Sequence, residues 1–530
     1  MPYADSPETV HEWATERAIS LWVISSGDLD PESVDTLGRG FAEARADGAR
    51  LALIVPPGGE PSAAEREAVD FLVAPNPGRA RFALFEALSA AGIDDVRDLG
   101  VLGASRHVLE MARRAGAGAV IGLATGGEQR RLLLDGQPDR IIDPSGFAAL
   151  DRDLFASGRA HRQRVLLNPG PSVVSDRIHR AVGGPDLCHR EPEYSAIFQR
   201  VREKLLRLAG VGDDWALVLL AGSGTAAMEA MTGASSQPGR KLLVCRNGTY
   251  GERIETIARR LGQEVVVVSA SDLEPISPQA VAAALDADPA IDAVAVIHHE
   301  TTTGLLNPVH EIARMADQRG VLTLVDAISS FGAEALEMAG TGIDFVACTS
   351  NKCLHGLPGA AFVLVSPRGQ ERIAAVPPRS LYFDLAAYLK AQAKHTVPFT
   401  PAIPAIYGLD AALDELLDEG LEHRQAYYKA RMGFLDGHFS RLGLEPRVAP
   451  ANRSHSVRGL PLPSGISYDT LHDALKQEGY VIYGGLGEAA RTSFRVCALG
   501  ALKIEVLADF IATLERVLIR FAEPAPLKQA

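Results

Sequence analysis

Short apolar runs alternate with helical patterns along most of this chain. In the first 150 residues the predicted strands cover residues 21–25, 50–59, 99–105 and 119–127, and the predicted helices cover residues 31–49, 80–92 and 106–116. Short apolar strands that alternate with helices are typical of a parallel sheet covered on both faces. This part of the chain therefore predicts an α/β domain.

The alternation continues after residue 165, over longer segments. Apolar strand-like runs cover residues 215–222, 241–248, 264–270, 292–304, 321–332, 344–352 and 359–367, with predicted helices at 223–234, 249–262 and 310–320. From about Ala411 the pattern becomes rich in helices, with short strands at residues 480–485 and 493–500. We therefore expect a large α/β domain followed by a smaller α+β domain.

A chain of 530 residues is too long for a single hydrophobic core, so at least two domains are expected. A polar, charged segment near residues 150–164 separates the two α/β patterns. The expected organisation is a tail, a first domain, a large domain and a small C-terminal domain, with bounds 1–18, 19–155, 165–410 and 411–530.

Composition and charge narrow the classes of partner. The net charge of −13 argues against nucleic acid, because phosphate backbones need clustered Lys and Arg. No apolar run approaches the roughly 20 residues of a membrane span, and the polar N-terminus does not resemble a secretory signal. Five scattered cysteines without a CxxC pair fit reduced thiols. A cytoplasmic protein that binds small molecules is expected.

Three strand ends carry residues suited to chemistry. The turn AGSGT, residues 221–225, leads directly into a helix whose free N–H groups favour an anion, although Ser223 or Thr225 could simply cap that helix. Asp326 ends an apolar strand, where ligands bind in open α/β sheets, and could equally cap the next turn. Lys352 follows another strand end.

The surroundings of Lys352 allow several hypotheses. In CTSNKCLHG the lysine lies between Cys348 and Cys353 and is followed by His355, which could indicate a metal site, a redox pair or a lysine kept for covalent chemistry. No second cluster of ligands completes a metal site, so none is predicted. A phosphate-binding turn, an Asp and a Lys at successive strand ends together match the needs of pyridoxal 5′-phosphate (PLP).

Several ordered motifs strengthen that hypothesis. The segment from about Val165 to the C-terminal helix resembles the class V, fold-type I aminotransferases, and within them the 2-aminoethylphosphonate:pyruvate aminotransferases, with alanine–glyoxylate and serine–pyruvate aminotransferases more distant. The resemblance rests on LLNPGPS, CHREPEY, AGSGTAAMEA, CRNGTYGER, HHETTTGLLNP, VDAISSFG, TSNKCLHGLPG and SFRVCALG, in family order.

The resemblance implies a role for each matching residue. Lys352 would form the Schiff base and shuttle the proton, and Asp326 would pair with the pyridinium nitrogen. The other expected cofactor contacts are Ser223, Gly224 and Thr225 at the phosphate, Tyr250 stacked on the ring, and Thr301 near the ring oxygen. The reaction expected is a ping-pong transfer of an amino group from an amino donor to a keto acid.

Substrate and partner expectations also follow from the resemblance. Arg495 would hold the substrate carboxylate, and Arg379 or Arg190 could supply a second anion contact or be surface charges. Thr400 matches a threonine that the family delivers to the phosphate of the neighbouring subunit, which implies a homodimer with shared active sites.

The first domain resembles the haloacid-dehalogenase-like (HAD-like) hydrolases, so the expected fold is a HAD-like Rossmannoid domain followed by a fold-type I transferase. That hydrolase chemistry needs an Asp at the end of the first strand, where Ser25 and Gly27 stand here; Asp28 and Asp30 lie beyond it, and Ala104 replaces a later acidic residue. We therefore expect a catalytically degenerate domain for binding, dimer support or partner contact.

Three alternatives remain at this stage. One is an alanine–glyoxylate or serine–pyruvate type of aminotransferase. Another is a class V lyase such as a cysteine desulfurase, although Cys497 lies in an apolar strand-like segment rather than a loop. The third is a non-catalytic PLP-binding regulator or scaffold, against which the presence of Lys352, Asp326 and Arg495 counts.

Overall fold

The protein is described by a computed structural model that divides into two compact units, Met1–Arg164 and Val165–Ala530. The structure describes residues 21–25, 50–55, 60–61, 63, 66, 69–73, 83–93, 99–117, 119–123, 132–133, 140–142, 164–486 and 490–522. Among these residues, no helix combines the length and the apolar character needed to cross a membrane.

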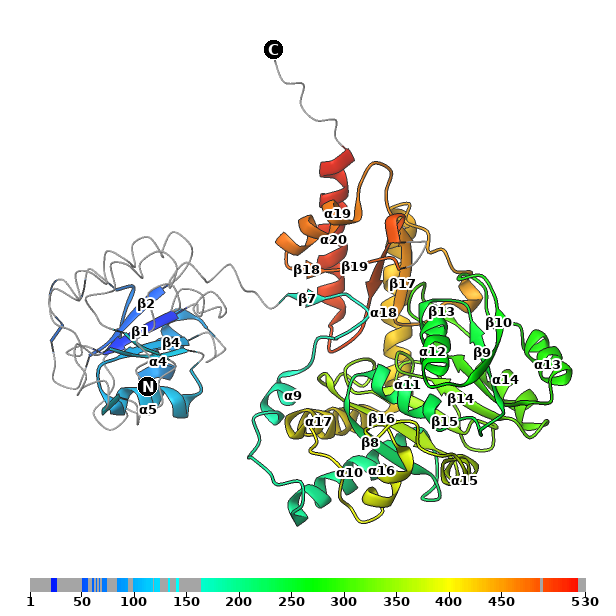
Figure 1. Ribbon diagram of the computed structural model, residues 1–530. Coiled ribbons are helices and arrows are strands. Elements are labelled where there is room, and N and C mark those ends of the chain that lie inside the picture. The colour runs from blue at the N-terminus through cyan, green and yellow to red at the C-terminus, as the bar shows by residue number, and fades with distance from the viewer. Residues whose placement is uncertain are drawn as a thin grey trace. The chain divides into compact units, whose positions relative to one another are not determined.

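The N-terminal unit is built on a parallel sheet with the strand order β3-β2-β1-β4-β5-β6 (Figure 1). Its strands are β1 Leu21–Ser25, β2 Arg50–Ile54, β3 Phe71–Val73, β4 Leu99–Gly103, β5 Ala119–Leu123 and β6 Arg140–Ile142, and its helices include α4 Ala83–Ala91 and α5 Arg106–Ala115. This order is typical of doubly wound α/β domains. The predicted α/β character of this part of the chain is confirmed.

Two details of this unit bear on the expected hydrolase positions. Strand β1 ends at Ser25, and β4 ends one residue before Ala104, so both positions lie at the carboxyl ends of neighbouring strands. Gly27, Asp28, Asp30 and the helix predicted at 31–49 lie outside the described residues.

The C-terminal unit contains a seven-stranded sheet with the order β10-β9-β11-β14-β15-β16-β8. Strand β16 alone runs in the direction opposite to the other six strands. The strands are β8 Ala216–Gly222, β9 Lys241–Arg246, β10 Glu264–Ser269, β11 Ile291–Ile297, β14 Leu322–Asp326, β15 Phe345–Thr349 and β16 Gly359–Val365. Alternate residues of β11 join the cores on opposite faces of the sheet, as the two-residue repeat of a strand requires.

Helices cover both faces of this sheet (Figure 1). One core includes buried side chains of α10 Pro192–Ala209, α13 Pro278–Ala287, α14 Val309–Asp317 and α17 Ile403–Glu419. The other includes buried side chains of α11 Gly224–Gly233, α12 Thr249–Arg260, α15 Pro367–Ala375 and α16 Leu385–Gln392. The sheet is therefore the middle of three layers, and its fully buried strands explain the continuous apolar runs in the sequence.

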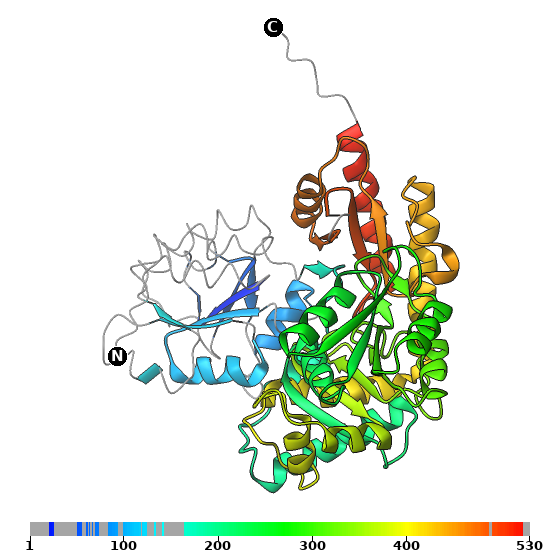
Figure 2. The same cartoon turned by 45° about the vertical axis from the view of Figure 1, so that its right-hand side comes forward.

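A smaller part follows at the C-terminal end of this unit. A three-stranded antiparallel sheet with the order β17-β20-β19 packs with helices around a separate core. Its elements are β17 Val457–Pro461, β19 Tyr483–Gly484, β20 Ser493–Cys497, α18 Leu421–Arg441, α19 Tyr468–Gln477 and α20 Ile504–Ala522. In Figure 2 the red helix α20 stands beside these strands, apart from the green strands of the large sheet.

In the structure, the large and small parts meet near Gly420 rather than at residue 410. Helix α17 runs through that position without a break, and its Leu409, Leu413 and Leu416 belong to the core of the seven-stranded sheet. Gly420, with a φ of 88°, separates α17 from α18, so the chain passes to the small part there. At the other end, β7 (Val165–Leu166) pairs with β18 (Tyr480–Val481), which ties the start of this unit to its C-terminal part.

Candidate active site

The three predicted strand-end segments meet at one edge of the seven-stranded sheet. Strands β8, β14 and β15 run in the same direction, so their carboxyl ends lie along the same edge. Asp326 is the last residue of β14, Lys352 follows β15, and Ser223 follows β8. The fold therefore gathers residues that are distant in the sequence.

These segments enclose a cavity of about 150 Å³. The predicted site residues that line it are Ser223, Gly224, Thr225, Tyr250, Asp326 and Lys352. The other lining residues are Met228, Arg253, His299, Ile328, Ser329, Thr349 and Asn351. The structure thus brings six of the predicted residues together in one place.

The start of α11 forms one wall suited to an anion. Ser223 is the N-cap residue but makes no capping hydrogen bond through its side chain, so the capping role considered from the sequence does not occupy its hydroxyl. Gly224 is required by close packing, because an added Cβ would lie 2.7 Å from the side chain of Ile328. Arg253 adds a positive charge and donates to Thr225 Oγ1 at 3.3 Å. A helix N-terminus with a nearby guanidinium is a good phosphate site.

Asp326 is a carboxylate in an apolar environment. Only 4% of its surface is exposed, and its Oδ1 accepts a hydrogen bond from the backbone N–H of Ile328 at 2.9 Å. Burial raises the pKa of the Asp326 carboxyl to about 7. A buried carboxylate of this kind needs a positively charged partner to be ionised comfortably at neutral pH.

Lys352 is partly buried and also lines the cavity. Burial lowers the pKa of its ammonium group, and the positive charge of Arg495 lowers it further, although the thiols of Cys497 and Cys353 act in the opposite direction. Its Nζ donates to the carbonyl oxygen of Pro169. Gly170 (φ 112°) has no room for a side chain, because a Cβ would come within 2.6 Å of the lysine. A lowered pKa favours the neutral, nucleophilic amine.

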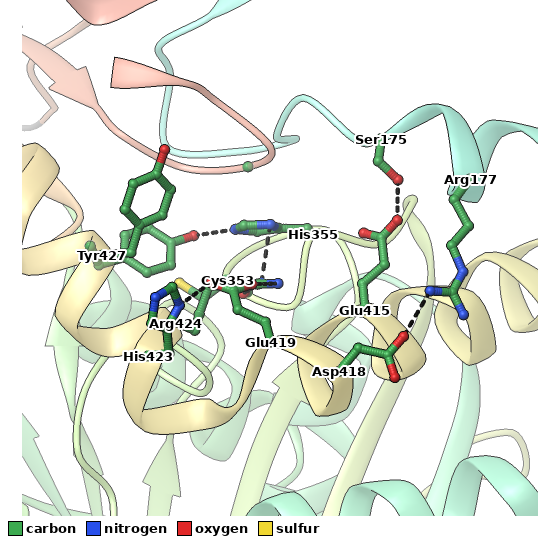
Figure 3. Close-up of polar contacts among 12 residues, drawn as sticks. Ser175, Arg177, Cys353, His355, Glu415, Asp418, Glu419, His423, Arg424 and Tyr427 are labelled. Carbon is green, nitrogen blue, oxygen red and sulfur yellow. Dashed lines mark hydrogen bonds and ion pairs between the residues drawn. The ribbon is translucent and has the colours of Figure 1, made fainter. Parts of the chain in front are cut away.

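The turn that carries Lys352 is held by a buried polar network from α18 (Figure 3). His355 has a φ of 63°, and its N–H donates to the carbonyl oxygen of Lys352 at 2.9 Å. Arg424 donates to His355 Nδ1 at 3.1 Å and pairs with Glu419 at 2.5 Å. Because a guanidinium can only donate, His355 Nε2 must carry the proton, which it donates to Tyr428 Oη at 2.6 Å. The strained His355 is thus fixed from both sides of its ring.

The two cysteines beside Lys352 are packed thiols. Cys348 lies in β15, and Cys353 donates to the carbonyl oxygen of Ser329 at 3.2 Å. Burial raises the pKa of Cys353 to about 12 and that of Cys348 well above its ordinary value. Both are therefore poor nucleophiles and poor metal ligands. Across the described ranges, no group of three or more His, Cys, Asp or Glu side chains is arranged to hold a metal ion.

A buried glutamate positions the ring of Tyr250. The fully buried Glu300 accepts a hydrogen bond from the N–H of Tyr250 at 3.1 Å, where α12 begins. On the same helix, Arg253 places its guanidinium 4.7 Å from the centre of the Tyr250 ring. Sequence reasoning missed both Glu300 and Arg253. Their only signals were their places inside the motifs HHETTTG and GTYGER.

Thr301 and Arg495 are also buried and touch each other. Arg495 donates from Nη1 to the carbonyl oxygen of Thr301 at 3.2 Å and from Nε to that of Gly484 at 2.9 Å. The side chain of Thr301 has no partner for its Oγ1. Neither Thr301 nor Arg495 is among the residues that line the cavity, although the charge of Arg495 contributes to the lowering of the Lys352 pKa.

The other predicted residues lie away from the cavity. Arg379 donates to the carbonyl oxygens of Gly233 at 2.6 Å and Ser236 at 2.9 Å, at the end of α11 opposite to the cavity. Its guanidinium is engaged in satisfying helix-end carbonyls, so nothing in this chain brings it to a substrate. Arg190 and Thr400 are exposed side chains that precede α10 and α17 respectively.

The residues at the cavity fit PLP. The anion wall suits the phosphate, the buried Asp326 suits a protonated ring nitrogen, and the amine of Lys352, whose pKa burial lowers, suits the aldehyde. Two buried polar atoms, Nε2 of the cavity-lining His299 and Oγ1 of Thr301, have no hydrogen-bond partner among the described residues. Such atoms are rare in native structures and indicate a missing ligand or water.

Comparison with known proteins agrees with this chemistry. The family model described as aminotransferase class-V matches residues 177–497. A 2-aminoethylphosphonate–pyruvate transaminase of Syntrophobacter fumaroxidans is 36% identical over 362 residues, covering 67% of this chain and 97% of the relative. Another, from Burkholderia thailandensis, is 36% identical over 361 residues, with 67% and 96% covered.

Solved structures point to the same family. An aspartate aminotransferase of Thermus thermophilus aligns with a TM-score of 0.62 at 30% identity, covering 67% of this chain and 99% of that one. An alanine–glyoxylate aminotransferase of Nostoc sp. aligns with a TM-score of 0.64 at 26% identity, covering 67% and 95%. Together with the geometry of the cavity, these matches establish that the chain belongs to the class V aminotransferases and is a PLP-dependent aminotransferase.

Proposed function

We propose that this enzyme transfers the amino group of 2-aminoethylphosphonate to pyruvate, giving phosphonoacetaldehyde and alanine. The observation that carries the proposal is Arg495, which is 3% exposed and has no carboxylate partner among the described residues. An unpaired buried cation is costly, so an anionic ligand is expected beside it. A phosphonate and a carboxylate both meet that need, and the relatives named above act on this substrate pair.

The protein residues divide the work of the transfer. Bound PLP acts as an electron sink that acidifies the carbon carrying the amino group. Lys352 Nζ would hold the cofactor and then move the proton from that carbon, and burial lowers the pKa of its ammonium group, which favours the neutral form that can accept this proton. Asp326 keeps the ring nitrogen protonated. Arg495 holds the substrate anion through the guanidinium hydrogens that the protein leaves free.

The remaining cofactor contacts complete the proposal. Ser223, Gly224 and Thr225 bind the phosphate at the start of α11, Tyr250 stacks on the ring, and Thr301 lies near the ring oxygen. The exposed position of Thr400 supports its delivery to the phosphate of a second subunit, which makes the enzyme a homodimer with shared active sites.

We propose that the N-terminal unit is a HAD-like module without hydrolase activity. Its parallel strand order and the neutral residues at the ends of β1 and β4 support this assignment. A magnesium-dependent phosphatase assay on the full chain should show no turnover. Turnover that is lost in Asp28→Asn would overturn the proposal.

The substrate assignment is tested by single half-reactions of the PLP-loaded enzyme. We expect 2-aminoethylphosphonate to deplete the visible absorption of the bound cofactor and pyruvate to restore it, because the two compounds occupy the same site in turn. Arg495→Gln should slow both half-reactions strongly, whereas Arg319→Gln, a change at a surface arginine that pairs with Asp286, should leave them intact.

Two results would contradict the assignment. If serine depletes the absorption and 2-aminoethylphosphonate does not, the enzyme is a serine–pyruvate type of aminotransferase. If glyoxylate restores the absorption and pyruvate does not, it is an alanine–glyoxylate type. A cysteine desulfurase is already disfavoured, because Cys497 is buried in β20 and burial raises its pKa to about 12.

A further inference from the structure

Two consecutive histidines follow β11, and only one of them lines the cofactor cavity. His298 is buried, and its Nδ1 lies 3.0 Å from the hydroxyl of Ser330. His299 is also buried, with 3% of its surface exposed, and its Nδ1 lies 2.9 Å from the carbonyl oxygen of Ser329. His299 is part of the cavity lining, together with Asp326 and Lys352, whereas His298 is not.

The hydrogen bond of His299 fixes its tautomer. A carbonyl oxygen only accepts, so Nδ1 must carry the proton and donate it to Ser329. Burial lowers the pKa of the His299 imidazole, an effect opposed by the charge of Glu334, so the ring is neutral at physiological pH. It follows that Nε2 presents a bare lone pair, and this atom has no partner in the part of the chain that the structure describes.

A second buried polar atom that lacks a hydrogen-bond partner among the described residues lies close by in the sequence. Thr301, two residues further along, also has a buried side-chain oxygen without a partner. Between them, Glu300 is satisfied by the start of α12 and by Thr302. An unsatisfied buried polar atom costs free energy. Because His299 also lines the cavity, a ligand bound there can supply the hydrogen-bond partner that Nε2 lacks.

We propose that His299 is a cofactor-contacting residue whose Nε2 accepts a hydrogen bond from an N–H or O–H group of bound PLP. This inference rests on PLP binding by the enzyme and does not depend on which amino donor it uses. It adds a contact that sequence reasoning did not assign, because HHETTTG gave no reason to prefer one histidine over the other.

Asparagine substitutions separate this contact from a structural role. In His299→Asn, the side-chain amide can still donate to Ser329, but the acceptor that faces the cavity is lost. His298→Asn is the matched control, because it changes an equally buried neighbour that does not line the cavity. His299→Gln extends a carbonyl oxygen toward the position of Nε2 and should restore part of the contact.

The measurement is the dissociation constant of PLP, followed by the visible absorption of the loaded protein. We expect His299→Asn to weaken PLP binding by about threefold to tenfold, the equivalent of one hydrogen bond, and to change the absorption spectrum. His298→Asn should bind PLP like the unmodified protein, and His299→Gln should fall between the two. Thermal unfolding of each apo variant confirms that the fold is retained.

Equal PLP affinity and an unchanged spectrum in His299→Asn would overturn the inference and indicate that water satisfies Nε2. Equal losses in His299→Asn and His298→Asn would also overturn it, because they would reflect packing. Failure of the unmodified protein to bind PLP would instead contradict the cofactor assignment itself.

Discussion

At the scale of single residues, the buried carboxyl of Asp326 makes the stability of the apo protein depend on pH. Its carboxyl is buried and has a pKa of about 7, against 3.8 in its unperturbed state. Between about pH 4 and pH 7 the folded apo protein keeps a proton that the unfolded chain releases. The free energy of unfolding therefore falls as the pH rises through this window and is level above it.

The prediction is that apo Asp326→Asn gains stability over the unmodified apo protein as the pH rises. The two should be similar near pH 4 and differ by no more than about 4 kcal/mol above pH 7, because asparagine has no proton to lose. Urea unfolding of both apo proteins between pH 4 and pH 8 measures the difference. A difference that does not change with pH would show that burial of the Asp326 carboxylate is not the cause.

The sequence indicated the chemically distinctive residues more clearly than the residues that surround and position them. Asp326 and Lys352 stand out because charged residues seldom end apolar strands. Glu300, Arg253 and His299 did not, because their roles depend on contacts between segments far apart in the chain. The contacts of Arg379 were hidden for the same reason: a local motif could not show that its guanidinium donates to the carbonyl oxygens of Gly233 and Ser236.

At the scale of elements, the periodicity of the sequence predicted where strands and helices lie, and the observed elements end at slightly different residues. The helix predicted at residues 223–234 is α11, Gly224–Gly233, and the strand predicted at 359–367 is β16, Gly359–Val365. The run 292–304 does not continue as one strand, because β11 ends at Ile297 and His299–Glu300 form a separate short strand, β12, that pairs with β13 (Leu305–Leu306).

The turn between β15 and β16 depends on α18 for its shape. Tyr428→Phe should leave the ring Nε2–H of His355 without a hydrogen-bond acceptor in a buried site, which costs about 1–3 kcal/mol of unfolding free energy. It should also lower kcat more than it raises KM, because the Lys352 turn loses its support. Urea unfolding and steady-state kinetics test both effects.

Tyr427→Phe is the control for this prediction. Tyr427 is the preceding residue on α18, is only partly buried, and donates to the carbonyl oxygen of Leu502 at 3.3 Å, away from the Lys352 turn. Tyr427→Phe should lower the free energy of unfolding only slightly and leave kcat and KM unchanged. Equal effects of the two substitutions on kcat would refute the supporting role of the His355 network.

At the scale of the whole molecule, the proposed dimer predicts complementation between two defective chains. If Thr400 of one subunit completes the site that contains Lys352 of the other, a mixed dimer of Lys352→Ala and Thr400→Ala chains has one intact site. We expect such a dimer, purified with two different tags, to regain about half of the unmodified activity. Activity no higher than that of Thr400→Ala alone would contradict the delivery of Thr400 to the site of the other subunit.

The central claim is that Lys352, in the turn after β15, is the residue that binds PLP covalently. Borohydride reduction of the PLP-loaded enzyme, followed by proteolysis and mass spectrometry, tests it most directly. We predict a phosphopyridoxyl group on the peptide that contains Lys352 and none in Lys352→Ala. Modification of a different lysine, or an unmodified Lys352 peptide after complete reduction, would contradict the claim.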